Sequence, residues 1–152
     1  MPKISPFLWF DAQAEEAANF YVSLFPNSKI TSVSRFDGDK VMTVGFELDG
    51  QKLSALNGGP MFKFTEAVSF VVDCEDQAEV DRYWDALIAD GGQPSQCAWL
   101  KDRFGLSWQI VPKRLFELMS DPDRGRAGRA TQAMLKMSKI IIADLEAAAD
   151  AG

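Results

Sequence analysis

The sequence contains no histidine among its 152 residues, and this absence excludes several classes of site. Serine–histidine–aspartate triads, cysteine–histidine nucleophiles and imidazole-ligated zinc, iron, copper or nickel centres all require that side chain. Any acid–base chemistry in this chain therefore has to use Asp, Glu, Tyr, Lys, Cys or water.

Cysteine is nearly absent as well, with Cys74 and Cys97 as its two members. They are far apart in the sequence and form no CxxC motif, so they supply neither a zinc knuckle nor a thioredoxin-type redox pair. A reduced, intracellular protein is the simpler expectation. A disulfide between the two cysteines is the alternative, and sequence alone cannot give the distance between them.

Long apolar runs are also missing. The longest runs, around Val68–Val72 and Ile140–Ala143, are far shorter than the roughly 20 residues needed to cross a bilayer. The first residues show no signal-peptide pattern. Lys and Arg number 16 against 22 Asp and Glu, a balance that argues against capture of nucleic acid or an anionic membrane. We therefore expect a cytoplasmic protein with neither of these partners.

The residues that are present have the balance of a globular protein, with 47% apolar and 25% charged. A chain of this length is about the size of one ordinary domain, so a single domain over residues 1–152 is expected. The patterns below divide it into a first module over about 1–62, a second over about 63–112 and a C-terminal helical extension over about 113–152.

The first module begins with the aromatic run Phe7–Phe10, which predicts a strand buried on both faces. A helix is predicted over Ala12–Phe25, where small and aromatic residues recur every three or four positions before Pro26. Three alternating segments separated by turn residues then predict a meander of strands, at Lys29–Phe36, Val41–Leu48 and Gln51–Asn57.

The second half of the chain repeats this order. Ser69–Asp73 matches Phe7–Asp11, and the residues that follow each segment also match, so a duplication of about 60 residues is the simplest account. Chance similarity between two strand–helix units is the alternative. The remaining predicted elements are a helix over Gln77–Ala89, closed by two glycines, and a hairpin of Trp99–Lys101 and Leu106–Val111.

Beyond Pro112 the composition changes. Asp121–Gly128 is predicted to be a charged loop, and one long helix is predicted from Arg129 to about Ala149. Four residues of that helix form a narrow apolar stripe, namely Ala130, Met134, Met137 and Ile141. Such a helix has to pack on its own domain or on a partner chain, and the sequence leaves both open.

Three polar residues interrupt or end apolar strands: Asn57, Ser69 and Gln109. A buried amide or hydroxyl needs hydrogen-bond partners, so each is either part of the fold or directed at a cavity. Tryptophans are mostly core residues, but one of the four is expected to line a cavity. We take Trp99 as that residue, which gives Asn57, Ser69, Trp99 and Gln109 as the candidate ligand-binding set.

A resemblance to a known family extends over nearly the whole chain. The segments that carry it are Pro6–Asp11, Ala14–Ala17 with Phe20–Tyr21, Asn57–Pro60 with Phe62–Phe64, Val72–Cys74, Asp102–Pro112 and Met134–Lys139. They resemble the PhnB-like proteins, also described as 3-demethylubiquinone-9 3-methyltransferase domains. That family is part of the vicinal oxygen chelate superfamily of glyoxalase I, bleomycin-resistance proteins and extradiol dioxygenases. The resemblance implies an α+β fold in which two βαβββ modules form curved mixed sheets, with a C-terminal helix, and it implies a homodimer.

The resemblance also implies where a cofactor would lie. Superfamily members with metal-dependent chemistry place His or Glu on the first and last strands of each module. The corresponding position in this chain holds Gln109, a weak neutral ligand, so no bound metal is expected. S-adenosylmethionine is not supported either, because the chain has no glycine-rich loop and no acid placed to hold a ribose.

Three functions remain open at this stage. The favoured hypothesis is a metal-independent, homodimeric protein that binds a small organic ligand in an apolar cleft. The first alternative is an enzyme, either the methyltransferase of the family description or a lyase or isomerase of the glyoxalase superfamily that uses carboxylate and water. The second alternative is a structural or interaction role in which the C-terminal helix matters more than any cleft.

Overall fold

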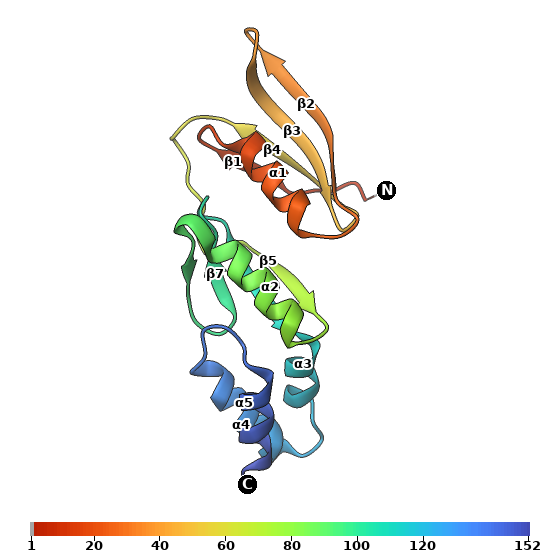
Figure 1. Cartoon of the computed structure of the whole chain (residues 1–152), viewed down its shortest axis with the longest axis vertical. Helices are drawn as coiled ribbons and strands as arrows, with labels where there is room; N and C mark the ends of the chain where they lie inside the picture. Colours follow the sequence, from red (N-terminus) through yellow and green to blue (C-terminus); the bar gives the residue numbers. More distant parts are fainter. Residues whose placement is uncertain (1) are drawn as a thin grey trace. The chain divides into compact units, whose positions relative to one another are not determined.

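The computed structural model describes residues 2–152 and has two compact units, one ending at Phe64 and the other comprising Thr65–Gly152 (Figure 1). Each unit contains one four-stranded sheet built from a strand, a helix and three further strands. The predicted α+β fold of two βαβββ modules with a helical C-terminal part is therefore confirmed.

The first unit contains β1 (Phe7–Phe10), α1 (Ala14–Leu24), β2 (Lys29–Phe36), β3 (Lys40–Leu48) and β4 (Gln51–Asn57). The strand order is β1-β4-β3-β2, with β1 parallel to β4 and the other neighbours antiparallel. The predicted meander is confirmed. Its first turn has three residues, Asp37–Asp39, and takes left-handed backbone at Asp37 (φ 49°) and Gly38 (φ 82°), a conformation that Asp and Gly tolerate.

The expectation that Phe7–Phe10 is buried on both faces is wrong. Leu8 and Phe10 are buried, whereas 61% of Phe7 is exposed. The reason is that α1 covers one face of the sheet by packing on β2, β3 and β4, so side chains along β1 alternate between the covered face and an open face. The covered face holds the core of the unit, which includes Tyr21 and Phe46.

The second unit repeats this topology. Its sheet elements are β5 (Ser69–Cys74), α2 (Gln77–Ile88), the short 3-10 helix η1 (Ala89–Gly91), β6 (Gln93–Pro94), β7 (Trp99–Lys101) and β8 (Ser107–Pro112). The strand order is β5-β8-β7-β6, and β5 is parallel to β8, as β1 is to β4. This shared order agrees with the predicted duplication. The two-residue strand β6 was not predicted, because it has no alternating pattern of its own.

The C-terminal part differs from the prediction. It contains three helices, α3 (Lys113–Met119), α4 (Arg124–Leu135) and α5 (Ile142–Asp150). The predicted loop Asp121–Gly128 is wrong, because the Asp123 side chain accepts hydrogen bonds from the backbone N–H groups of Gly125 and Arg126 and so starts α4 at Arg124. Helix α3 was not predicted.

The single long helix from Arg129 to Ala149 is also wrong, because residues 136–141 leave the helical path. Their backbone groups form hydrogen bonds outside the helix. The N–H groups of Cys97 and Ala98 donate to the carbonyl oxygens of Met137 (2.8 Å) and Ser138 (2.9 Å). On the other side, the Gln77 side chain donates to the Ile140 carbonyl oxygen and accepts from the Ile142 N–H. These tertiary hydrogen bonds replace the helical ones.

The three C-terminal helices pack within their own chain. Together with residues of the sheet they form a C-terminal cluster of eight buried side chains: Ala98, Val111, Leu115, Leu118, Ala130, Ile140, Leu145 and Ala149. Ile140 is fully buried, whereas 36% of Ile141 is exposed. The isoleucine that joins the core is therefore Ile140, and not Ile141 as the predicted stripe had it. The sequence left open whether this region packs on its own domain or on a partner chain, and the structure shows packing on its own domain.

The structure also bears on the expectations about membrane-spanning segments and about the two cysteines. None of the helices described for residues 2–152 is long and apolar enough to cross a membrane. Cys74 and Cys97 are free thiols, and burial raises the pKa of Cys74 to about 12. The Cys74 thiol therefore stays protonated, and poorly reactive, at neutral pH.

Candidate functional site

The candidate site lies on the open face of the second unit's sheet. Leu100, Trp108 and Ile110 are buried, and α2 packs against β7 and β8. Because side chains alternate along a strand, the neighbours of these core residues point to the opposite face. They are Trp99 and Lys101 on β7, and Ser107 and Gln109 on β8.

Strand register arranges these side chains in two rows. One row joins Ser69, Ser107 and Lys101 across β5, β8 and β7, and the next joins Val71, Gln109 and Trp99. The Gln109 Nε2 atom donates a hydrogen bond to the Ser69 Oγ atom over 3.0 Å. The structure thus brings together three of the four predicted site residues, Ser69, Trp99 and Gln109.

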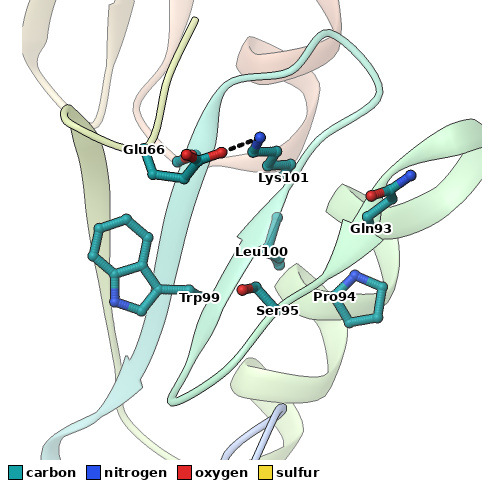
Figure 2. Close-up of a pocket in the computed structure, with 8 residues that line it drawn as sticks. Glu66, Gln93, Pro94, Ser95, Trp99, Leu100 and Lys101 are labelled. Carbon is teal, nitrogen blue, oxygen red and sulfur yellow. Dashed lines mark ion pairs between the residues drawn. The ribbon is translucent and has the colours of Figure 1, made fainter.

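A hollow of about 240 Å³ opens on this unit. Figure 2 shows the Glu66–Lys101 ion pair at one side of it, with Trp99 below the pair and Gln93 and Pro94 across from Trp99. In full, the hollow is lined by Glu66, Gln93, Pro94, Ser95, Trp99, Leu100, Lys101 and Ser107. It therefore combines an aromatic surface, an ion pair and small polar groups.

The ion pair with Lys101 affects the protonation of Glu66. A hydrogen bond from Lys101 lowers the pKa of the Glu66 carboxyl below its ordinary value. Glu66 is the one carboxylate among the described residues that line the hollow. Because its lowered pKa makes it a weaker base, it is poorly suited to remove a proton from a substrate at neutral pH.

Ser107 is the most unusual polar group of the hollow. Its side chain is fully buried, and its Oγ atom has no hydrogen-bond partner among the residues that the structure describes. Nearly all buried hydroxyl groups in proteins are hydrogen-bonded, so such an atom needs an explanation. Its position directly across from Lys101 places it beside the charged end of the hollow.

The wall at Ser95 is held by the C-terminal extension. The Ser138 hydroxyl donates to the Ser95 carbonyl oxygen over 2.5 Å, and the Ser95 N–H donates to the Trp99 carbonyl oxygen over 2.9 Å. Residues 136–141 therefore fix the backbone that carries Ser95 and Trp99. The irregular segment between α4 and α5 thus supports the hollow.

Asn57, the fourth predicted site residue, lies in the first unit and is bonded within the fold. Its Oδ1 atom accepts a hydrogen bond from the Ala14 N–H at the start of α1 (2.8 Å), and its Nδ2 atom donates to the Val41 carbonyl oxygen (3.1 Å). Both ends of the amide are therefore used to join α1, β3 and β4.

We expect Asn57→Ala to lower the free energy of unfolding by about 1–3 kcal/mol, because it leaves the Ala14 N–H and the Val41 carbonyl without their partner. Urea denaturation measures this loss. Asn19→Ala is the matched control, since Asn19 makes one exposed hydrogen bond within α1 and should change the stability little. Equal stabilities of the two variants would contradict the structural role of Asn57.

The glycines after Asn57 are also explained by packing. A Cβ atom on Gly58 would lie 2.4 Å from the Trp9 ring, and the Trp9 indole N–H donates to the Gly59 carbonyl oxygen. The Asn57–Pro60 segment therefore closes the first unit around Trp9. Packing around Trp9 is therefore enough to explain why this segment has the residues that resemble the family.

Asp102 has a similar role in the second unit. Its buried carboxylate accepts hydrogen bonds from the N–H groups of Phe104 and Leu106 and from the Trp108 indole N–H, all at 2.9–3.0 Å. One side chain thus shapes the turn between β7 and β8 and sets the ring of Trp108. From the sequence, Asp102 was known only as the first residue of the segment Asp102–Pro112 that carries the family resemblance.

Lys101, Ser107 and Glu66 line the hollow but were not among the predicted site residues. Strand periodicity from Trp99 and Gln109 could have indicated the first two, because each lies two residues away on the same strand. Glu66 comes from the segment before β5, and no periodic signal places it opposite Lys101.

The donor set does not fit a metal ion. Among the described residues, no three Cys, Asp or Glu side chains come together in a way that could hold one. At the position implied by the resemblance, Gln109 and Ser69 are neutral and are hydrogen-bonded to each other. They offer nothing to offset the cost of removing water from a divalent cation. The hollow is also smaller than the usual site for an adenosine-sized cofactor.

Comparison with known proteins gives one family match. The sequence model described as 3-demethylubiquinone-9 3-methyltransferase matches residues 2–111, which ends just before α3. No curated protein matches the chain. Among solved structures, the PhnB protein from Bacillus cereus, which carries the same methyltransferase description, is 35% identical. It covers 73% of this chain and 99% of its own, with a TM-score of 0.67.

Two more distant structures share the fold. Protein PA1353 from Pseudomonas aeruginosa is 20% identical over 74% of this chain and 98% of its own, with a TM-score of 0.61. The fosfomycin resistance protein FosX from Listeria monocytogenes, solved with Mn(II) and sulfate, is 15% identical over 74% of this chain and 91% of its own, with a TM-score of 0.53. These matches support a fold of the glyoxalase and bleomycin-resistance type.

Proposed function

Because this chain belongs to the 3-demethylubiquinone-9 3-methyltransferase family, we propose that it is a PhnB-like protein that binds a small organic ligand without a metal ion. The observation that carries this proposal is the hollow with Trp99 on its wall. Ser69 and Gln109 do not line it, but strand register places them beside its lining residues Ser107 and Trp99. An aromatic surface with a few polar groups beside it is the usual composition of a small-molecule site.

Metal independence is supported by the neutral donor set at Ser69 and Gln109. Native mass spectrometry of protein purified without a histidine tag, with and without added Mn(II), tests it. The same measurement reads the subunit number, since a homodimer remains a prediction, and the mass of any co-purified organic ligand. We expect an organic adduct and no metal. One metal ion bound per chain would contradict the proposal.

Gln109 is the residue that we expect to orient the ligand. Gln109→Leu should weaken binding of the co-purified compound by about tenfold or more, because one hydrogen bond is lost and the Ser69 hydroxyl loses its partner. Isothermal titration calorimetry measures the affinity. Gln51→Leu, an exposed position of the first unit, is the control that should bind normally. Unchanged affinity in Gln109→Leu would remove Gln109 from the site.

A second candidate function is catalysis. The family description and the Bacillus cereus relative name a methyltransferase, and a lyase or isomerase of the glyoxalase superfamily is the other enzymatic possibility. The lowered pKa of Glu66 disfavours proton abstraction by a lyase or isomerase. The small volume of the hollow disfavours a site shared by S-adenosylmethionine and a quinone. Incubation with S-adenosylmethionine and 3-demethylubiquinone tests the methyltransferase, and a methylated product would favour catalysis.

A further inference from the structure

We infer that the hollow selects a planar, single-ring carboxylic acid, with the ring against Trp99 and the carboxylate held by Lys101 and Ser107. This inference rests on the proposed function, because it names the ligand class of the same site. It is carried by the ion pair, by the buried Ser107 hydroxyl and by the size of the hollow.

Lys101 is the group of the hollow that can hold an anionic ligand. Lys101 is paired with Glu66, whose side chain is 62% exposed, while that of Lys101 is 40% exposed. Ion pairs this open to water contribute little, so they exchange readily. A ligand carboxylate that is more shielded than Glu66 can therefore replace it on Lys101, while the displaced Glu66 carboxylate, 62% exposed, is solvated by water.

Ser107 supplies the second contact. Its hydroxyl is buried, lacks a partner among the described residues and lies across from Lys101 in the β7–β8 register. A carboxylate has two oxygen atoms, and it can accept from an ammonium group and a hydroxyl group together. The bound acid would thus satisfy a buried side-chain oxygen that has no hydrogen-bond partner among the described residues.

Trp99 and the volume limit the rest of the ligand. Trp99 lies next to Lys101 in the same face of β7 and lines the hollow, where it offers a flat surface for a ring. The hollow of about 240 Å³ equals the space of roughly eight water molecules in the liquid. This space suits a ligand of about ten non-hydrogen atoms, the size of one ring with a carboxylate.

Three probes separate the contributions of charge and ring. Benzoate carries both features, benzamide has nearly the same shape without the charge, and cyclohexanecarboxylate has the charge without the flat ring. Titrations followed by two-dimensional NMR measure the three affinities. We expect benzoate to bind about tenfold or more tightly than benzamide, as hydrogen bonds to a charged group require, and more tightly than cyclohexanecarboxylate. Equal binding of benzoate and benzamide, or no binding of benzoate, would overturn the inference.

Variants assign the contacts. Lys101→Gln should weaken benzoate by about tenfold or more and leave benzamide unchanged. Glu66→Gln should tighten benzoate several-fold, because Lys101 then has no internal competitor. Ser107→Ala should weaken benzoate without lowering the melting temperature, since the lost hydroxyl has no partner in the fold. Benzoate binding that is indifferent to Lys101→Gln and Glu66→Gln would also overturn the inference.

The result is separable from that of the proposed function. If a co-purified compound binds through Gln109 but benzoate and benzamide bind alike, the hollow remains a ligand site and only the acid class is wrong. If no organic compound is found and Gln109→Leu has no effect, the proposed function itself fails.

Discussion

Replacing Asp102 with alanine is expected to lower the free energy of unfolding by about 3–5 kcal/mol, because two buried N–H groups and one part-buried N–H group lose a charged acceptor at once. The carboxylate is 3% exposed and bonds Phe104, Leu106 and Trp108. Its loss leaves the turn between β7 and β8 without its internal support. Urea denaturation followed by circular dichroism measures the change.

Two variants show whether the effect comes from these hydrogen bonds. Asp102→Asn keeps one carbonyl oxygen for the two backbone N–H groups and should cost less than the alanine variant. Asp39→Ala removes an exposed carboxylate from a hairpin turn of the first unit and should change stability by less than about 0.5 kcal/mol. If Asp102→Ala is as stable as Asp39→Ala, the turn does not depend on this side chain.

Ile140→Ala is expected to cost about 2–5 kcal/mol, the range for deleting most of a buried aliphatic side chain and leaving a cavity. Ile140 is fully buried in the C-terminal cluster, and its carbonyl oxygen accepts a hydrogen bond from Gln77. The same denaturation experiment measures the loss.

Ile141 provides a control of the same residue type in the adjacent position. Because 36% of its surface is exposed, Ile141→Ala should cost less than about 1 kcal/mol. A continuous helix with a stripe through Ile141 predicts the reverse order. The order of the two stabilities therefore decides between the broken helix of the structure and the continuous helix that the sequence favours.

The sheet elements could be predicted from the sequence because their signals are local. Alternating side chains and the left-handed turn residues Asp37 and Gly38 define β2 and β3, and a helix pattern bounded by Pro26 defines α1. Whether a sheet is covered on one face or on both is not a local property, and for this reason Phe7–Phe10 could not be distinguished from a fully buried strand.

The candidate site could be predicted only in part. Polar residues inside apolar strands drew attention to Ser69 and Gln109, which contact each other. The same signal drew attention to Asn57, whose amide is hydrogen-bonded to the backbone of Ala14 and Val41. Sequence cannot distinguish an amide that joins α1 to two strands from one that bonds to a neighbouring side chain on a sheet face, because both are polar residues on apolar strands.

The sequence by itself determined the family, the repeated βαβββ order and the exclusion of histidine chemistry, because motifs, periodicity and composition are written along the chain. Only the tertiary structure decided the end of α4 and the hollow. At residues 136–141, hydrogen bonds to Cys97, Ala98 and Gln77 outweigh helix propensity, which is a weak preference for each residue. Glu66, Lys101 and Ser107 likewise meet only when strand register brings distant segments together.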